Sequence, residues 1–353
     1  MPALAVATAS ILAIAAATLG PLPGQATQSA VTPFLCLPCG ETGGADLILN
    51  IVLFLPLGLS LAALGWSGMA AAMSGFALSG LVEALQYLVI PGRDASLGDL
   101  VANTAGAAVG WALWASRDMW LRPSPAVARR LGAAWVLGVG ALLGFTHWAL
   151  HSDLSGSTWY GQWGGEPPEF FTGQVLEVRL GGVKLRHWRI PESVRRGATR
   201  AADTVLFEAV IRTGPTAVES GRVLSVADSV ARFVSFGQHG DDLTFGIRTR
   251  SAKLRLLAPR FLLDQGMKAK LGDTLELRGQ YADGRASVES QGTRLRSMDV
   301  QLTALDSWVF FWPGAVRHGS LLLLLRTGTL VVLLVPLWGW VRWLGKRKAA
   351  RLE

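Results

Sequence analysis

Six stretches of about 20 consecutive apolar residues limit what this chain can fold into. A helix needs about that many apolar residues to cross the hydrocarbon core of a bilayer. The stretches lie near residues 4–22, 47–65, 69–90, 97–116, 131–150 and 320–344. Half of the 353 residues are hydrophobic and only 16% are charged, which excludes a single soluble globule. The sequence predicts an α-helical polytopic membrane bundle of about six transmembrane helices.

The segment between the last two apolar stretches has a different amino-acid composition. Residues 151–316 are polar, rich in Arg and interrupted by turn signals. Short alternating runs recur there at residues 174–180, 205–212, 222–226, 231–236, 243–248, 274–281 and 286–290. Such spacing predicts an inserted all-β sandwich or jelly roll. We therefore expect a transmembrane domain at 1–150, an exported sandwich at 151–316, and a final helix with a basic tail at 317–353.

Positive charges in the short segments set the expected orientation. Residues 117–130 contain four Arg, and the tail after residue 341 contains five Lys and Arg. Cytoplasmic loops hold an excess of these residues, so both segments and the N-terminus are expected inside and 151–316 outside. This topology explains much of the net charge of +8, and nucleic acid is not an expected partner.

The first apolar stretch has two interpretations. It is either a membrane helix that is retained or a signal peptide that is removed. No Lys or Arg precedes it, and no obvious cleavage site follows it before Pro21 and Pro23. We therefore expect a retained helix.

Three of the expected helices carry a carboxylate and an amide one turn apart. The pairs are Asp46 with Asn50, Glu83 with Gln86, and Asp99 with Asn103. These spacings put both members of a pair on one helix face, and the expected topology places all of them toward the outer surface. An ionisable group inside a membrane span is costly, which indicates function by default. Arg93, in the turn above, is expected to neutralise Glu83 or Asp99 or to bind an anionic ligand.

The chemistry of this polar site stays open between three interpretations. As a catalytic site it offers Glu83 and Asp99 as acid–base candidates, since the region has no Ser/His or Cys/His arrangement. As a binding site it offers Asp46, Asn50, Gln86, Arg93 and Asn103, with Asp46 and Asp99 able to hold Mg²⁺ beside a phosphate. As structure alone, the amides bond across helices, and Gly106 with Gly110 permits close packing. No cofactor is assigned.

These residues also resemble a known family. The blocks are Asp46-x3-Asn50, Leu53-Phe54-Leu55-Pro56-Leu57-Gly58, Glu83-x2-Gln86, Arg93, and Asp99-x3-Asn103-x2-Gly106-x3-Gly110. In this order and spacing they resemble the VanZ family of small bacterial membrane proteins, over roughly residues 30–116. The resemblance implies a multi-pass bacterial membrane protein, which we expect in the cytoplasmic (inner) membrane, and the positive charges of the tail place its C-terminus in the cytoplasm. It suggests a role in glycopeptide-antibiotic resistance but carries no general reaction.

A second resemblance concerns the expected sandwich. Residues 205–210, 222–226, 233–246 and 279–285 are similar to the laminin-G-like, concanavalin A-like lectin fold. It implies glycan or protein ligands on a loop rim or concave face, sometimes with Ca²⁺. Asp228, Asp241 and Asp242 are either Ca²⁺ ligands or turn residues. Trp159, Tyr160 and Trp163 either stack on sugars or form an interfacial belt.

Three further features have open roles. Cys36 and Cys39 either form a local disulfide, remain thiols, or bind zinc together with His147 and His151. The two histidines are otherwise interfacial. Arg326 interrupts the last apolar stretch, where it either snorkels to the interface or pairs with Glu83, Asp99 or Asp46.

The hypothesis is a VanZ-like protein of the cell envelope. Its outward-facing acidic and amide site engages an anionic lipid-linked phosphate, and its sandwich recognises an envelope glycan. The lipid bilayer is the other expected partner, and whether the protein is an enzyme stays open. The alternative is a non-enzymatic, membrane-anchored adaptor whose sandwich binds a protein or a polysaccharide.

Overall fold

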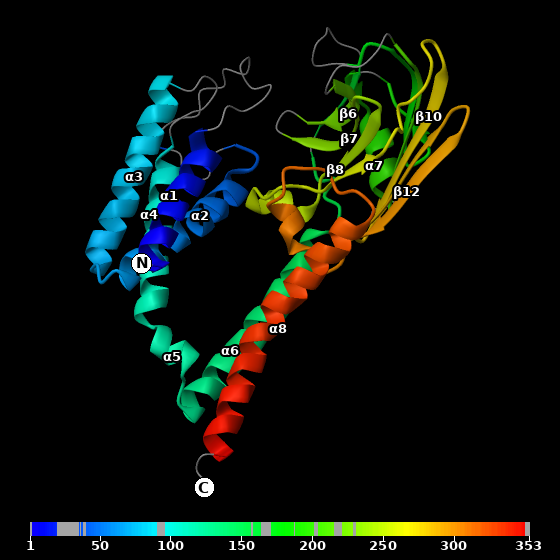
Figure 1. The fold of residues 1–353 in the computed structure, drawn as a ribbon. Helices are drawn as coiled ribbons and strands as arrows, with labels where there is room; N and C mark the ends of the chain where they lie inside the picture. The colour runs from blue at the N-terminus through cyan, green and yellow to red at the C-terminus, as the bar shows by residue number, and fades with distance from the viewer. Residues whose placement is uncertain are drawn as a thin grey trace. The chain divides into compact units, whose positions relative to one another are not determined.

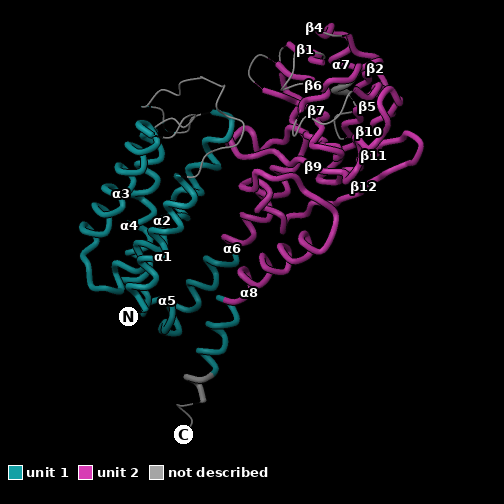
Figure 2. The backbone as a smooth tube through the Cα atoms, turned by 45° about the horizontal axis from the view of Figure 1, so that its top comes forward, with its two compact units in different colours: residues 1–136, 336–353 teal, residues 137–335 magenta. Residues whose placement is uncertain are grey.

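The computed structural model describes most of the chain in two compact units (Figure 1). The described residues are 2–19, 35, 37, 40–89, 96–156, 158–163, 171–186, 188–200, 204–214, 221–228 and 231–349. One unit is Met1–Val136 with Pro336–Glu353, and the other is Leu137–Val335 (Figure 2). The second unit therefore contains the sandwich together with the adjoining parts of two long helices.

The apolar stretches form helices, as expected. They are α1 (Pro2–Leu19), α2 (Gly43–Ala63), α3 (Gly68–Val89), α4 (Leu97–Ala115), α6 (Pro125–Ala149) and α8 (Ser320–Ala349), with the short α5 (Arg117–Leu121) between α4 and α6. Five of them, α1, α2, α3, α6 and α8, are long and apolar enough to cross a membrane by length and composition. Helix α4 falls outside this set because Asp99 and Asn103 lower its hydropathy. The chain is a multi-pass membrane protein.

Helices α2 and α4 approach one another at their backbones. A Cβ added to Gly58 would lie 2.0 Å from the carbonyl oxygen of Ala107, and one added to Gly110 would lie 2.2 Å from that of Leu55. Only glycine permits this approach, as in the small-residue interfaces common between membrane helices. The two helices thus form the centre of the first unit.

Helix α1 packs against this centre. Ile14 is fully buried and belongs to one apolar cluster with Phe54, Leu57, Leu61 and Val82 of α2 and α3. Between membrane helices such packing is stabilised by van der Waals contacts rather than by the removal of apolar surface from water. Helix α1 is therefore an integral part of the bundle.

The region after α6 consists mainly of two six-stranded antiparallel sheets. Their orders are β4-β1-β6-β7-β8-β9 and β12-β11-β10-β5-β2-β3. The strands are β1 (Trp159–Trp163), β2 (Gln174–Leu180), β3 (Val183–Lys184), β4 (Trp188–Ile190), β5 (Val205–Arg212), β6 (Gly221–Ala227), β7 (Arg232–His239), β8 (Asp242–Ile247), β9 (Arg260–Leu263), β10 (Thr274–Ala282), β11 (Arg285–Gln291) and β12 (Leu295–Gln301), and helix α7 (Glu192–Arg200) lies between β4 and β5.

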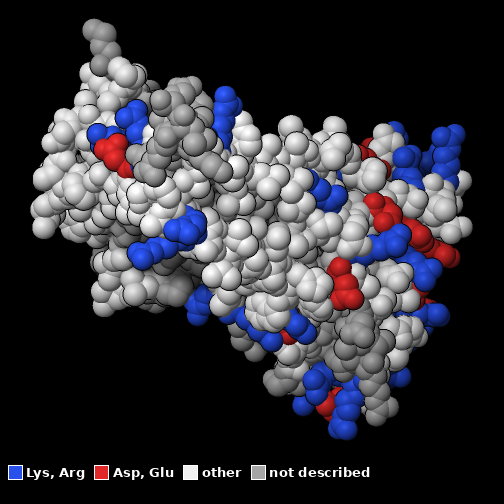
Figure 3. All heavy atoms as spheres, turned by 90° about the horizontal axis from the view of Figure 1, so that it is seen from below, with Lys and Arg blue, Asp and Glu red and all other residues white. Residues whose placement is uncertain are grey.

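Aromatic side chains fill the space between the sheets. Phe207 of one sheet stacks on Phe236 of the other with ring centroids 5.1 Å apart, and Phe261 faces Tyr281 at 6.0 Å. The region is therefore a β-sandwich. Its membership of the jelly-roll or lectin class stays a prediction. Charged side chains are dense over the sandwich and sparse over the helices (Figure 3).

Both interpretations of Trp159 are wrong, and of the two left open for Arg326 the pairing with a bundle carboxylate is wrong. Trp159 does not stack on a sugar or face a membrane, because it lies in the core against Phe233 at a ring distance of 5.3 Å. Arg326 does not pair with a carboxylate of the bundle. Its guanidinium donates to the carboxylate of Asp306 from Nε at 2.9 Å and from Nη2 at 2.8 Å.

Candidate functional site

The polar residues of the bundle contact one another mainly across helices. The Nδ2 of Asn50 in α2 donates to Oδ1 of Asp99 in α4 at 2.6 Å. Within the described residues, Asp46 does not contact another helix in this way. It accepts a hydrogen bond from Oγ1 of Thr42, the N-cap residue of its own helix, at 2.9 Å. A charge-assisted hydrogen bond is shorter and stronger than a neutral one, so the Asn50–Asp99 contact fixes α2 against α4.

Glu83 joins α3 to the start of α4. It is buried, and its Oε2 accepts a hydrogen bond from the backbone N–H of Ser96 at 2.8 Å. Ser96 is the N-cap of α4 and its hydroxyl accepts from the N–H of Gly98 at 3.1 Å. The first N–H groups of a helix lack partners within the helix and carry partial positive charge. The carboxylate is therefore stabilised where α4 begins.

The two remaining amides reach other helices. Nε2 of Gln86 donates to the carbonyl oxygen of Thr18 in α1 at 2.9 Å, and Nδ2 of Asn103 donates to Oγ of Ser79 in α3 at 2.9 Å. Asn103 is only 2% exposed, and its Oδ1 has no hydrogen-bond donor within the described part of the chain. An unsatisfied buried acceptor costs about 1–3 kcal/mol, so this oxygen is a place where a donor from a bound molecule would be stabilised.

The structure thus brings the predicted site residues together at helix contacts. Asn50, Gln86 and Asn103 each bond to a different helix, which is the structural role considered for them above. Arg93, Cys36 and Cys39 lie outside the described residues. No group of three or more His, Cys, Asp or Glu is arranged to hold a metal ion in the ranges that the structure describes.

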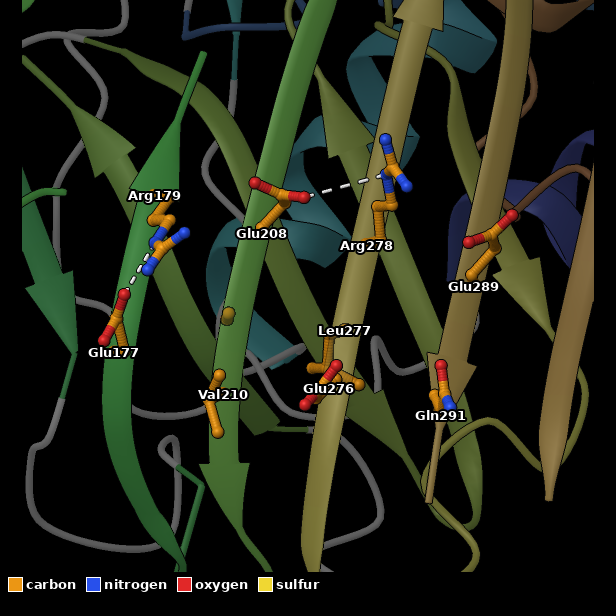
Figure 4. Close-up of a pocket in the computed structure, with 10 residues that line it drawn as sticks. Glu177, Arg179, Glu208, Val210, Glu276, Leu277, Arg278, Glu289 and Gln291 are labelled. Carbon is orange, nitrogen blue, oxygen red and sulfur yellow. Dashed lines mark hydrogen bonds and ion pairs between the residues drawn. The ribbon is translucent and has the colours of Figure 1, made fainter. Parts of the chain in front are cut away.

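A second candidate site lies on the outer face of the sandwich. A depression of about 350 Å³ spans β2, β5, β10 and β11 (Figure 4). We call it the charged groove; its polar lining is Glu177, Arg179, Glu208, Glu276, Arg278, Glu289 and Gln291. The strand register sets Arg179, Glu208, Arg278 and Glu289 side by side in one row of alternating charge. Opposite charges in neighbouring strands stabilise such a face.

Ion pairs occupy one side of the charged groove. Glu177 contacts Nζ of Lys184 at 2.9 Å and Nε of Arg179 at 2.6 Å, and these two hydrogen bonds lower the pKa of its carboxyl group. Arg278 lies 3.7 Å from Glu208. Sequence reasoning missed the groove, although its residues are the outward positions of the strands predicted at 174–180, 205–212 and 274–281. No aromatic residue lines it.

The acidic residues considered for Ca²⁺ serve turns and strand contacts. Oδ1 of Asp228 accepts from the N–H of Ala231 at 2.6 Å, and Oδ1 of Asp242 accepts from the N–H of Gln265 at 2.7 Å. His151 lies edge-on to His147 with ring centroids 5.0 Å apart, and its Nε2 is 3.4 Å from Asp283. The contact between His151 and Asp283 links the end of α6 to the sandwich.

Comparison with known proteins identifies only the helical part. The family model described as VanZ/LLP1 matches residues 9–121. This range contains α2 to α5 and most of α1, and so every predicted site residue of the bundle. No curated protein and no solved structure matches the chain. The chain is thus a membrane protein with a VanZ-like domain at residues 9–121, followed by a β-sandwich that this similarity does not cover.

Proposed function

We propose that the VanZ-like domain binds the polar headgroup of an anionic, lipid-linked intermediate of the bacterial cell envelope. The observation that supports this is a set of buried and half-buried acceptors in an otherwise apolar bundle. Asp99, Glu83 and Oδ1 of Asn103 are acceptors on α3 and α4, and the last has no donor in the described structure. Helices that needed only to pack would not require carboxylates at these positions.

In this proposal the acceptors bind donor groups of the headgroup. Hydroxyl or ammonium hydrogens would reach Oδ1 of Asn103 and the carboxylate oxygens of Asp99 and Glu83. The anionic part of the ligand requires a cation, and Arg93, which follows α3 in the sequence, supplies it. The sandwich, in the same proposal, recognises glycan through its charged groove.

Native mass spectrometry of the protein extracted gently from its own membrane tests the headgroup site. The wild type should retain a polyprenyl phosphate or pyrophosphate whose headgroup also carries hydroxyl or ammonium groups, and Glu83→Gln and Arg93→Ala should lose it. Glu83→Gln keeps an oxygen acceptor for the N–H of Ser96, so the start of α4 is preserved. Asp118→Asn, in α5, is the matched control and should retain the lipid. The same lipid in all four proteins, or none in the wild type, would refute the site.

The charged groove supports the second candidate function, a membrane-anchored adaptor. Its volume lies within the 300–1,000 Å³ typical of small-ligand sites. In an adaptor the helices serve only as an anchor, so Glu83→Gln should leave the cellular phenotype of the wild type intact. Replacing Glu276 and Glu289 with Gln should abolish it under either proposal, because both use the charged groove. Loss of the phenotype in Glu83→Gln would exclude the adaptor.

A further inference from the structure

Basic side chains gather at one end of the sheet that contains β7, β8 and β9. Arg232 begins β7, Arg248 follows β8, and Arg260 begins β9. The antiparallel pairing Val234↔Ile247 and Gly246↔Arg260 places these three positions at the same end. A 3₁₀ turn, η1 (Arg250–Leu254), continues from there. We call this set the basic edge; it consists of Arg232, Arg248, Arg250, Lys253, Arg255 and Arg260.

The basic edge lies directly beside the end of a candidate membrane span. Helix α6 ends at Ala149, and the backbone just after it pairs with the basic edge. The N–H of Arg250 donates to the carbonyl of His151 at 2.9 Å, and the N–H of Asp153 donates to the carbonyl of Arg248 at 2.9 Å. Two residues of chain reach at most about 7 Å. The contact at His151 therefore lies within that distance of the end of α6, a helix long and apolar enough to cross a membrane.

The tip of the basic edge is held in a fixed shape. Thr249 and Ser251 are fully buried with their hydroxyl oxygens 2.8 Å apart, and Oγ of Ser251 donates to the carbonyl of Leu257 at 3.0 Å. Arg255 has a φ of 55°, in the left-handed region that non-glycine residues rarely adopt. These constraints expose Lys253 and Leu254, the latter with 53% of its surface accessible. An exposed apolar side chain between two cations is typical of interfacial segments.

Three cations of the edge have no acidic partner in the described structure. Arg232, Arg250 and Lys253 form no ion pair with a described carboxylate. Partial burial and then the charge of Arg232 lower the pKa of Arg260. Asp153, in the paired segment, is buried and accepts from the N–H of Ser155 at 3.2 Å. An external anion would relieve the repulsion between these guanidinium groups.

We propose that the basic edge rests on the membrane and binds the phosphates of anionic phospholipids, with Leu254 entering the headgroup region. The occupant is a lipid surface because the edge is tied to the end of α6, which brings it to the bilayer without any further partner. Each cation near an anionic surface contributes about 1 kcal/mol, or about fivefold in the association constant. The proposal concerns the sandwich alone and does not depend on the headgroup site of the bundle.

Hydrogen exchange of the full chain in nanodiscs tests the proposal. Discs of phosphatidylcholine are compared with discs that contain phosphatidylglycerol, and exchange is followed at residues 250–257. Exchange should be slower in the anionic discs at low salt, and the difference should shrink in 0.5 M NaCl because the Debye length falls to about 4 Å. Arg250→Gln with Lys253→Gln should weaken the association about 25-fold and remove the difference.

The matched control removes two cations from the other sheet. Arg294 lies in the turn between β11 and β12, and Arg296 lies near the start of β12. Because the β10–β11 turn lies near Leu150, to which Tyr281 donates, this hairpin is at the far end of the sandwich. Arg294→Gln with Arg296→Gln should leave the lipid dependence unchanged. Equal exchange in both kinds of disc, or an equal loss in the control, would overturn the proposal.

Discussion

Replacing Arg326 with Leu should destabilise the sandwich although the change lies in a membrane helix. Asp306, just after the last strand, has a fully buried side chain, whereas that of Arg326 is 25% exposed. The carboxylate of Asp306 accepts two hydrogen bonds from Nε and Nη2 of Arg326, and others from the N–H and hydroxyl of Thr303. Nη2 of Arg326 also donates to the carbonyl of Gln301. One guanidinium therefore joins α8 to the end of β12.

The expected cost follows from what the substitution leaves behind. Removing one partner of a buried ion pair costs about 3–5 kcal/mol, because the other charge stays buried without compensation. Arg326 is partly exposed, so water can reach the site and the lower value, about 3 kcal/mol, applies. Replacing Asp306 with Asn as well should recover part of the loss, since no net charge is then buried. The losses in the free energy of unfolding of the two single variants, added together, should therefore exceed the loss in the double variant.

Thermal unfolding in nanodiscs, followed by the fluorescence of the 14 tryptophans, measures this cost. For a domain of 150–250 residues each kcal/mol shifts Tm by about 2–4 °C, so Arg326→Leu should lower Tm by about 6–12 °C. Arg317→Leu is the control, because Arg317 pairs with Asp264 at 3.2 Å on the surface. Exposed pairs contribute about 0–1 kcal/mol. A Tm for Arg326→Leu no lower than that of the control would refute the reasoning.

Two further predictions concern the helix contact and the charged groove. Gly110→Ala should destabilise the bundle by about 1–3 kcal/mol, because the added methyl meets the backbone of α2. Gly138→Ala, in open space on α6, is the control and should leave the Tm of the bundle unchanged or raise it. Equal Tm values for the two variants would contradict the prediction. The lowered pKa of Glu177 means that its ion pairs contribute stability in full above the ordinary pKa of 4.5 and lose it as the pH falls below that value. The melting curves of wild type and Glu177→Gln should therefore differ at pH 6 and converge near pH 3.

The sequence alone predicts the helices and most of the strands that have one face in the core. Hydropathy and length alone indicate a spanning helix, and alternation alone indicates a half-buried strand such as β5 or β10. Strand β12 was missed because only Met298 and Val300 face the core in a run that is otherwise polar. Strand β1 was missed because Trp159 follows an apolar helix, where an aromatic residue resembles an interfacial belt.

The candidate site could be predicted only in part. The spacing of Asp99 and Asn103 fixes the helix face on which they lie, but it does not say which helix that face contacts. Their partners, Asn50 and Ser79, depend on the packing of three helices. The partner of Arg326 was likewise inaccessible, because Asp306 lies 20 residues earlier and approaches only through the folded end of the sandwich.

Two contacts join the sandwich to the adjoining helices, and they have a mechanical consequence. The hydroxyl of Tyr281 holds it to the end of α6, and Arg326 holds it to α8. The sandwich therefore cannot swivel freely about its connections, and a tilt of this helix pair in the bilayer swings the distal hairpins through a larger arc. A fluorophore on the hairpin between β11 and β12 would move further than the helices themselves and would therefore report small rotations of the two helices.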